Sequence, residues 1–427
     1  MSWNEHPSRH SILSEVHSRP HELVVAPVRI NHLVFFVDRS ARAADREHMH
    51  KLLYGIRGAR NDTRGNFVSA DIAGIRVRWE RHTEFVSYTF LMPLTASTPA
   101  SLNAYDQLDA AWLHAIPGQL LVAQRLDVVL ADAPATTAAA GRQLDAASLV
   151  GAALGNQQFT LYTDFRARDD GSVHFLLGVD GEPPPRRLGR YVQRILEIET
   201  YRMMALLGLP DARDASDQLE TAERGLADLS TRLQTAQRSD ETSLLEAITE
   251  LATQVEAIYA RSHTRFSASA AYYSLVDARV GELRQSPITG VQTVTQFLER
   301  RLGPAMSTCS ATNQRLENLS RRIAHVSELL RTRVSIEQSE SQYELLQTMT
   351  RRQGVQLKLQ SAVEGLSIAA ITYYAAGLIA YLSKAAIPFG WPVSTEMTVA
   401  LSVPVIALAL WLGGRRLHRR IEEAIRE

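Results

Sequence analysis

A run of about twenty largely apolar residues near the carboxyl end limits this chain more than any other feature. Residues 363–382 read VEGLSIAAITYYAAGLIAYL, which is the length that an α-helix needs to cross a bilayer core of about 30 Å. A second apolar run follows at residues 398–414, after a connection that contains proline. The two runs predict a transmembrane helical hairpin at residues 363–414. A buried hairpin of a soluble protein is the alternative, because Tyr373, Tyr374 and Pro404 weaken the apolar signal.

Basic residues on both sides of the hairpin predict its orientation. The connecting loop holds only one of them, whereas the flanks hold Arg351, Arg352, Lys358, Arg415, Arg416, Arg419 and Arg420. Since cytoplasmic flanks carry the excess of Lys and Arg, both ends of the chain are expected in the cytoplasm. Residues 415–427 would form a basic cytoplasmic tail. The first residues lack the pattern of a secretory signal, so the large amino-terminal part is not expected to be exported.

Charge and residue usage narrow the class of protein. The chain has 46 basic and 46 acidic residues, which gives no electrostatic case for binding nucleic acid. Cys309 is the single cysteine, and this fits a reducing compartment. Nearly all basic residues are arginine and alanine is abundant, a usage typical of GC-rich bacterial genomes. The combined expectation is a protein of the bacterial inner membrane with two spans, and the lipid bilayer is its first expected partner.

Residues 1–182 predict a cytoplasmic α/β domain. Runs rich in β-branched and aromatic residues predict strands at 28–37, 67–72, 75–81, 84–92, 120–130, 159–165 and 173–179. Helical composition lies between them at 38–54, 101–116 and 136–154. Several predicted strands are consecutive, so the sheet is expected to be mixed or antiparallel, and the fold class is α+β.

Two stretches of this domain concentrate ionisable side chains. The first is HSRPH at residues 17–21, and the second is a row at every other residue from Arg76 to Glu84. Period-two spacing places such a row on one face of a strand. The candidate ligand or partner site therefore consists of His17, Arg19, Arg78, Glu80, His82 and Glu84. The alternative is the solvated face of a strand whose Val77 and Trp79 point inward, a face that is lost if residues 81–83 turn.

The chain contains no motif for a known catalytic site or cofactor. A phosphate-binding loop, a nucleophile elbow and a zinc-binding helix are all missing from the sequence. Catalytic, cofactor-binding and metal-binding residues are therefore not assigned, and the cofactor, the ion and the small-molecule ligand stay open.

Residues 183–362 predict a bundle of long helices or a coiled coil. Three consecutive prolines at 183–185 mark its start. Apolar residues then recur at steps of three and four along residues 219–233, 244–258 and 316–330, a pattern that buries narrow seams against other helices. Self-association is expected, but the same periodicity fits seams within one chain. A last helix is predicted from about residue 305 into the membrane, either as a stalk that transmits force or as part of a plain antiparallel bundle.

Several segments resemble a known bacterial family. They are HSRP at 17–20, RWERHTEF at 78–85, LEIETYRM at 196–203, and VEGLS at 363–367 followed by Tyr373 and Tyr374. These segments resemble the membrane-anchored family called domain of unknown function 3422. The resemblance covers nearly the whole chain and implies the bacterial inner membrane and a carboxy-terminal anchor. It implies no activity.

The order of the parts is also similar, more distantly, to that of CorA-type magnesium channels. Those channels have a cytoplasmic α/β domain, a long helix, two spans and a basic tail, and they carry Gly-Met-Asn at the outer end of the first span. Here that position reads Tyr381-Leu382-Ser383-Lys384. A lysine near a pore mouth repels cations, so the departure argues against magnesium conduction.

Three hypotheses for function follow. The first is a non-enzymatic scaffold for assembly or sensing that is anchored in the inner membrane. The second is a CorA-like ion channel or transporter. The third is an enzyme whose acid, base and anion-binding groups come from the six candidate site residues, which would then have to converge in one pocket.

Overall fold

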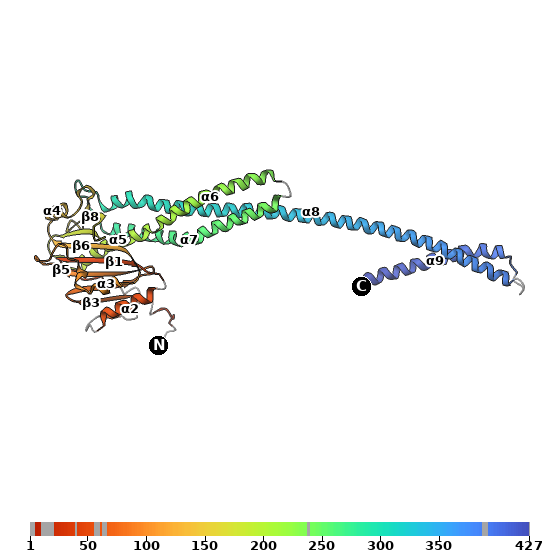
Figure 1. Cartoon of the computed structure of the whole chain (residues 1–427), viewed down its shortest axis with the longest axis horizontal. Coiled ribbons are helices and arrows are strands. Elements are labelled where there is room, and N and C mark those ends of the chain that lie inside the picture. Colours follow the sequence, from red (N-terminus) through yellow and green to blue (C-terminus); the bar gives the residue numbers. More distant parts are fainter. Residues whose placement is uncertain are drawn as a thin grey trace. The chain divides into compact units, whose positions relative to one another are not determined.

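The computed structural model describes residues 5–9, 21–38, 41–54, 60–61, 66–236, 240–386 and 392–426. The chain divides into two compact units, Met1–Ser327 and Glu328–Glu427. The first unit contains one sheet and a group of long helices, and the second contains a helical hairpin (Figure 1).

The sheet of the first unit has nine strands in the order β2-β3-β4-β5-β1-β6-β9-β8-β7. Its strands are β1 (Val28–Phe36), β2 (Arg60–Asn61), β3 (Phe67–Ile72), β4 (Ile75–Arg81), β5 (Phe85–Pro93), β6 (Gln119–Leu130), β7 (Val150–Leu154), β8 (Phe159–Ala167) and β9 (Val173–Val179). All neighbouring pairs are antiparallel except β6 and β9, which are parallel. The predicted mixed sheet and the seven strands predicted from β-branched runs are confirmed.

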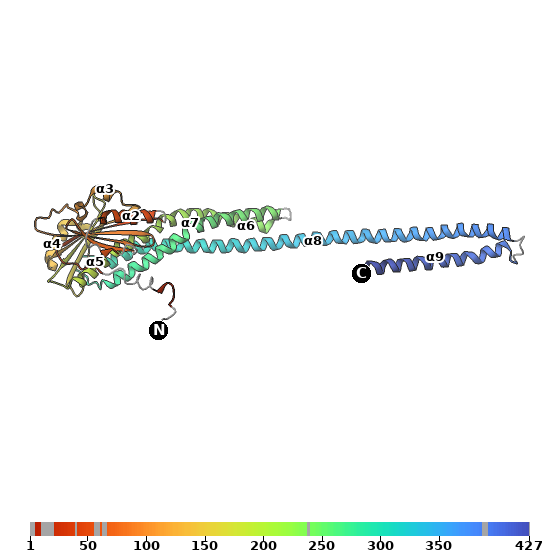
Figure 2. The same ribbon diagram turned by 90° about the horizontal axis from the view of Figure 1, so that it is seen from below.

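Helices cover both faces of this sheet. The face that holds Trp79 and Tyr88 packs against α2 (Ala41–Leu53), η1 (Ala104–Gln107) and α3 (Ala110–His114). At the other end of the same face lies α4 (Ala133–Gln143), which precedes the short η2 (Ala146–Ser148). The opposite face packs against α5 (Pro185–Leu206), and Gln124 of β6 donates a hydrogen bond to the Ile195 carbonyl of α5 there. In Figure 2, α2 and α3 lie on one side of the sheet and α5 lies on the other.

Long helices complete the first unit. These are α6 (Gly208–Thr235), α7 (Glu241–Glu282) and the first part of α8 (Val294–Ala386). They lie side by side in Figures 1 and 2, and Arg315 of α8 forms an ion pair with Glu223 of α6. Most of the predicted periodic apolar positions, among them Leu226, Leu251 and Leu316, are buried, and Leu229, Leu233 and Val326 are partly buried. In this unit, therefore, those apolar seams are buried by helices of the same chain.

Two helix predictions were wrong in detail. The helix expected at residues 136–154 ends at Gln143, and residues 150–154 form the edge strand β7. A β-carbon on Gly151 would lie 2.4 Å from the Tyr162 ring, so glycine allows β7 to pair closely with β8. The last helix does not start near residue 305. It starts at Val294 and continues through Pro304, which removes one backbone hydrogen bond without ending the helix.

The second unit consists of the remainder of α8 and the helix α9 (Thr395–Arg426). Both helices are long and apolar enough to cross a membrane, over Val294–Ala385 and Thr395–Arg416. Thr372 and Ser383 of α8 are buried in the hairpin, whereas most apolar side chains around them are exposed. An apolar outer surface on a two-helix hairpin is typical of a structure that lipid surrounds.

Candidate functional site

A small cavity lies in the first unit between α5 and the face of the sheet formed by β1, β4 and β5. Its volume is about 60 Å³, enough for a few water molecules. Glu22 and Val24 close one side, and the Val24 amide donates to the Pro185 carbonyl at the start of α5. Polar groups from five separate segments therefore meet in one cavity.

Arg78 of β4 forms the charged floor of the cavity. Its guanidinium donates to Glu80 Oε1 at 2.6 Å and lies 3.7 Å from Glu22 Oε2. Arg78 is only 5% exposed, and its guanidinium carbon lies 4.9 Å from the Phe67 ring centre. Alternation along a strand puts Arg78 and Glu80 on one face and Trp79 in the apolar core of the other. At Arg78 and Glu80 the polar face of β4 is thus covered by protein rather than solvated.

His32 of β1 lies beside Arg78 with both ring nitrogens hydrogen-bonded. Nδ1 lies 2.8 Å from Thr89 Oγ1, and Nε2 lies 3.2 Å from Thr200 Oγ1. Thr200 donates its own proton to the Leu196 carbonyl, so its oxygen accepts from His32 Nε2–H. The neutral ring then accepts at Nδ1 from Thr89. Burial lowers the pKa of His32 to about 4, so the ring is neutral at physiological pH.

Glu197 connects the cavity to helix α7. It accepts a hydrogen bond from Gln193 at 2.6 Å and forms an ion pair with Arg279 of α7. A second connection lies nearby, where Arg265 of α7 pairs with Glu84 at 2.9 Å. A change in the charge around Glu197 would therefore reach α7 directly.

The structure brings together three of the six candidate site residues. Arg78, Glu80 and His82 line the cavity. Glu84 instead pairs with Arg265, because β4 ends at Arg81 and the chain turns before Phe85, which ends the period-two row. His17 and Arg19 lie outside the described residues.

Arg76, the first member of the row, stays on the same strand face as Arg78. It does not line the cavity, because its guanidinium pairs with Asp71 and Glu22 at the surface.

Sequence reasoning missed the other half of the site. His32, Thr89, Glu197 and Thr200 all line the cavity and come from β1, β5 and α5. The sequence held one signal for them, since His32 is a polar residue inside the apolar run VRINHLVFF of a central strand. Such a residue must find hydrogen-bond partners inside the protein.

The lining favours a positively charged organic group over an anion. Three carboxylates, from Glu22, Glu80 and Glu197, face a single guanidinium, and the aromatic rings of Phe85 and Tyr201 border them. Carboxylates and ring faces both attract cations. Glu22 already has two arginine partners, Arg76 and Arg78, and Glu80 and Glu197 have one each. A carboxylate can accept about four hydrogen bonds, so further donors can still bind these groups. Within the described part of the chain, no group of three or more His, Cys, Asp and Glu is arranged to hold a metal.

Gly189 of α5 sets the distance between α5 and the segment that closes the cavity. A β-carbon at this position would lie 1.9 Å from the Glu22 carbonyl oxygen, so Gly189→Ala must displace that segment. We expect Gly189→Ala to lower the free energy of unfolding by about 1–3 kcal/mol. Gly225→Ala in α6 is the matched control, since its β-carbon would meet only Leu251 at 3.7 Å. The control is expected to raise stability by about 0.5–1 kcal/mol. Urea unfolding followed by tryptophan fluorescence measures both, and equal effects would contradict the close approach.

Comparison with known proteins places the chain in one family. No curated protein matches it. The resemblance to CorA-type channels receives no support. A family model does match nearly the whole chain, at residues 4–421, in agreement with the resemblance of its four segments. The chain therefore belongs to the family described as protein of unknown function (DUF3422).

Proposed function

We propose that this protein is a membrane-anchored sensor whose α/β domain binds a small organic cation. The observation that carries the proposal is the cavity beside α5, which three carboxylates, two aromatic rings and one guanidinium line together. A volume of about 60 Å³ limits the bound group to a few heavy atoms, such as an ammonium or guanidinium head group.

The anchor of this sensor is the helical hairpin of the second unit. In the proposal, residues 363–382 and 398–414 cross the bacterial inner membrane, and both termini lie in the cytoplasm. The exposed apolar side chains of α8 and α9 support this assignment. The basic residues that flank the hairpin support the orientation.

The signal in this proposal passes through α7. A cation that binds Glu197 competes with Arg279 for the same carboxylate, and the loss of that ion pair weakens the attachment of α7 to α5. Glu84 and Arg265 form a second attachment that stays in place. Binding would therefore shift the packing of α7 without releasing it, which is what a sensing domain needs.

Titration of the full chain in detergent with methylguanidinium chloride tests the cation site by calorimetry. We expect saturable binding that Glu80→Gln weakens about tenfold, because one charge-assisted hydrogen bond is worth roughly 1.5–3 kcal/mol. Glu47→Gln is the matched control, since Glu47 is exposed on α2 and pairs with Lys51 there. Sodium acetate at equal ionic strength is the control ligand. Saturable binding of acetate, or no binding of either compound, would refute the proposal.

A further inference from the structure

Helix α8 presents two different faces along its length. One face carries Leu302, Cys309, Leu316 and Ile323 at steps of seven, and all four are buried in the first unit. Further multiples of seven lead to Thr372, which is buried in the hairpin of the second unit. This face of α8 therefore packs against helices of its own chain in both units.

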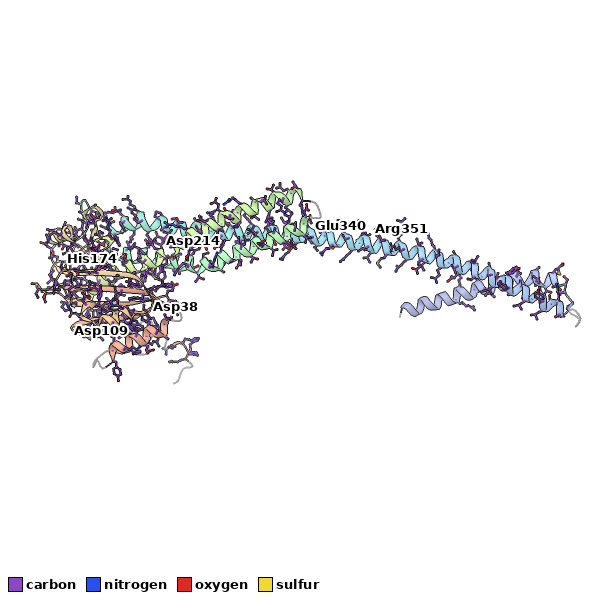
Figure 3. The ribbon with its side chains drawn as sticks, viewed as in Figure 1. Asp38, Asp109, His174, Asp214, Glu340 and Arg351 are labelled. Carbon is purple, nitrogen blue, oxygen red and sulfur yellow. The ribbon has the colours of Figure 1, made fainter. Side chains whose placement is uncertain are left out.

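The second face is uncovered and is apolar at six of its eight positions, the other two being Thr350 and Glu364. It carries Leu329, Ile336, Tyr343, Leu357, Ile371 and Leu378, again at multiples of seven. These side chains are between 49% and 64% exposed. In Figure 3 the side chains of α8 near Glu340 and Arg351 point outward, and among the described residues of this unit no helix runs beside that stretch. We name this face, from Leu329 to Tyr381, the α8 seam.

We propose that the α8 seam binds the α8 seam of a second copy of this chain, in parallel and in register. An apolar heptad row on the exposed side of a helix is typical of one helix of a coiled coil. Ile336 occupies the first apolar position of the heptad, and Leu346 occupies the second. A β-branched residue at the first position with leucine at the second favours a coiled coil of two helices. Lipid cannot cover the stretch from 336 to 357, since that stretch precedes the apolar span and is flanked by charges.

Charge complementarity selects the parallel arrangement. Glu328 and Arg333 flank the seam on opposite sides and are five residues apart. In a parallel, in-register pair, Glu328 of one copy faces Arg333 of the other, and symmetry makes this contact twice. Between residues 335 and 361 the positions that flank the seam hold one charged residue, Glu340. Like charges therefore do not oppose each other along this stretch. The one charge within the seam is Glu364, at the edge of the apolar span where water reaches it.

The apolar span extends the same seam. Tyr374 and Tyr381 continue its second apolar position and are 73% and 78% exposed. A phenol hydroxyl inside hydrocarbon needs a hydrogen-bond partner, and small polar contacts of this kind hold spanning helices together. A second copy in register brings an identical tyrosine to the same depth. A second copy of the chain would thus cover the seam along both the stretch before the apolar span and the span itself.

Cysteine crosslinking of the full chain in detergent tests the arrangement. Ile336→Cys and Tyr343→Cys place a thiol in the seam, and Glu337→Cys and Glu344→Cys place one on the other face as matched controls. The parent chain is the blank, because its only cysteine, Cys309, is buried. We expect the seam variants to form disulfide-linked dimers about tenfold faster than the controls, since only seam residues bring their β-carbons within disulfide reach. Equal rates, or faster dimers from the controls, would overturn the proposal.

Light scattering with the detergent contribution subtracted gives an independent readout. We expect at least two copies in the parent particle. The double variant Ile336→Glu, Tyr343→Glu is expected to release single copies, because it places like charges opposite each other. Both side chains are exposed in the single chain, so the variant leaves the fold of each copy intact. A parent chain that is already a single copy would contradict the seam.

Discussion

Replacing Asp127 by alanine is expected to lower the free energy of unfolding of the first unit by about 3–5 kcal/mol. Asp127 lies on β6 and accepts two hydrogen bonds from Arg29, at 2.8 and 3.0 Å, and two from Arg125, at 2.9 and 3.3 Å. Burial raises the pKa of Asp127, but the hydrogen bonds from Arg29 and Arg125 outweigh burial and hold the pKa below its usual range. Alanine would leave two buried guanidinium groups without their carboxylate.

The same ion pair fixes a loop to the sheet. Arg29 also donates to the carbonyls of Pro99 and Leu102, so the carboxylate of Asp127 orients a guanidinium that holds the chain just before η1. We therefore expect faster amide hydrogen exchange in residues 99–103 of Asp127→Ala, beyond the loss of global stability.

Asp71→Ala is the matched control for Asp127→Ala. Asp71 accepts two hydrogen bonds from Arg76, both at 2.8 Å, in the same bidentate geometry. Its side chain is 68% exposed, whereas that of Asp127 is 12% exposed. Exposed ion pairs contribute about 0–1 kcal/mol, so the control should change stability little. Urea unfolding of the full chain in detergent compares the two variants. An equal loss of free energy of unfolding in both variants would show that burial of the ion pair does not determine the loss of stability.

The strands were predictable because their signal is local. Seven of the nine carry β-branched or aromatic runs long enough to identify from composition alone. Strand β7 was not predictable, since its sequence Val-Gly-Ala-Ala-Leu has a composition that fits a helix equally well. What makes it a strand is the close approach of Gly151 to Tyr162, and neither periodicity nor propensity encodes that contact.

The candidate site was predictable only in part, for a similar reason. Period-two spacing identified Arg78 and Glu80 as neighbours on one strand face. The opposite wall comes from α5, where Glu197 and Thr200 are more than a hundred residues away along the chain. Their place in the cavity depends on how α5 crosses the sheet, and this crossing depends on Gly189 rather than on any pattern of polar residues.

Acid is expected to destabilise the first unit through His32. Burial lowers the pKa of this ring to about 4 from the value of 6.5 expected in the unfolded chain, while Glu80 acts in the opposite direction and His82 and Arg78 in the same direction. Between these two values the unfolded chain binds more protons than the folded one, so stability falls as the pH falls. Above pH 6.5 the stability from the neutral ring is fully present. We expect a loss of about 1.4 kcal/mol per pH unit from about pH 6.5 down to about 4, or roughly 3 kcal/mol in all.

His32→Gln separates this titration from the rest of the chain. Glutamine can accept a hydrogen bond from Thr89 and donate one to Thr200, so it keeps both partners without a titratable ring. Urea unfolding at half-unit steps of pH should then show a much smaller slope. A slope of the same sign will persist, because burial also lowers the pKa of His48 and of His174. A variant with the slope of the parent would mean that His32 is not the group that acid charges on unfolding. The stability of the cavity beside α5 would then not depend on keeping this imidazole neutral.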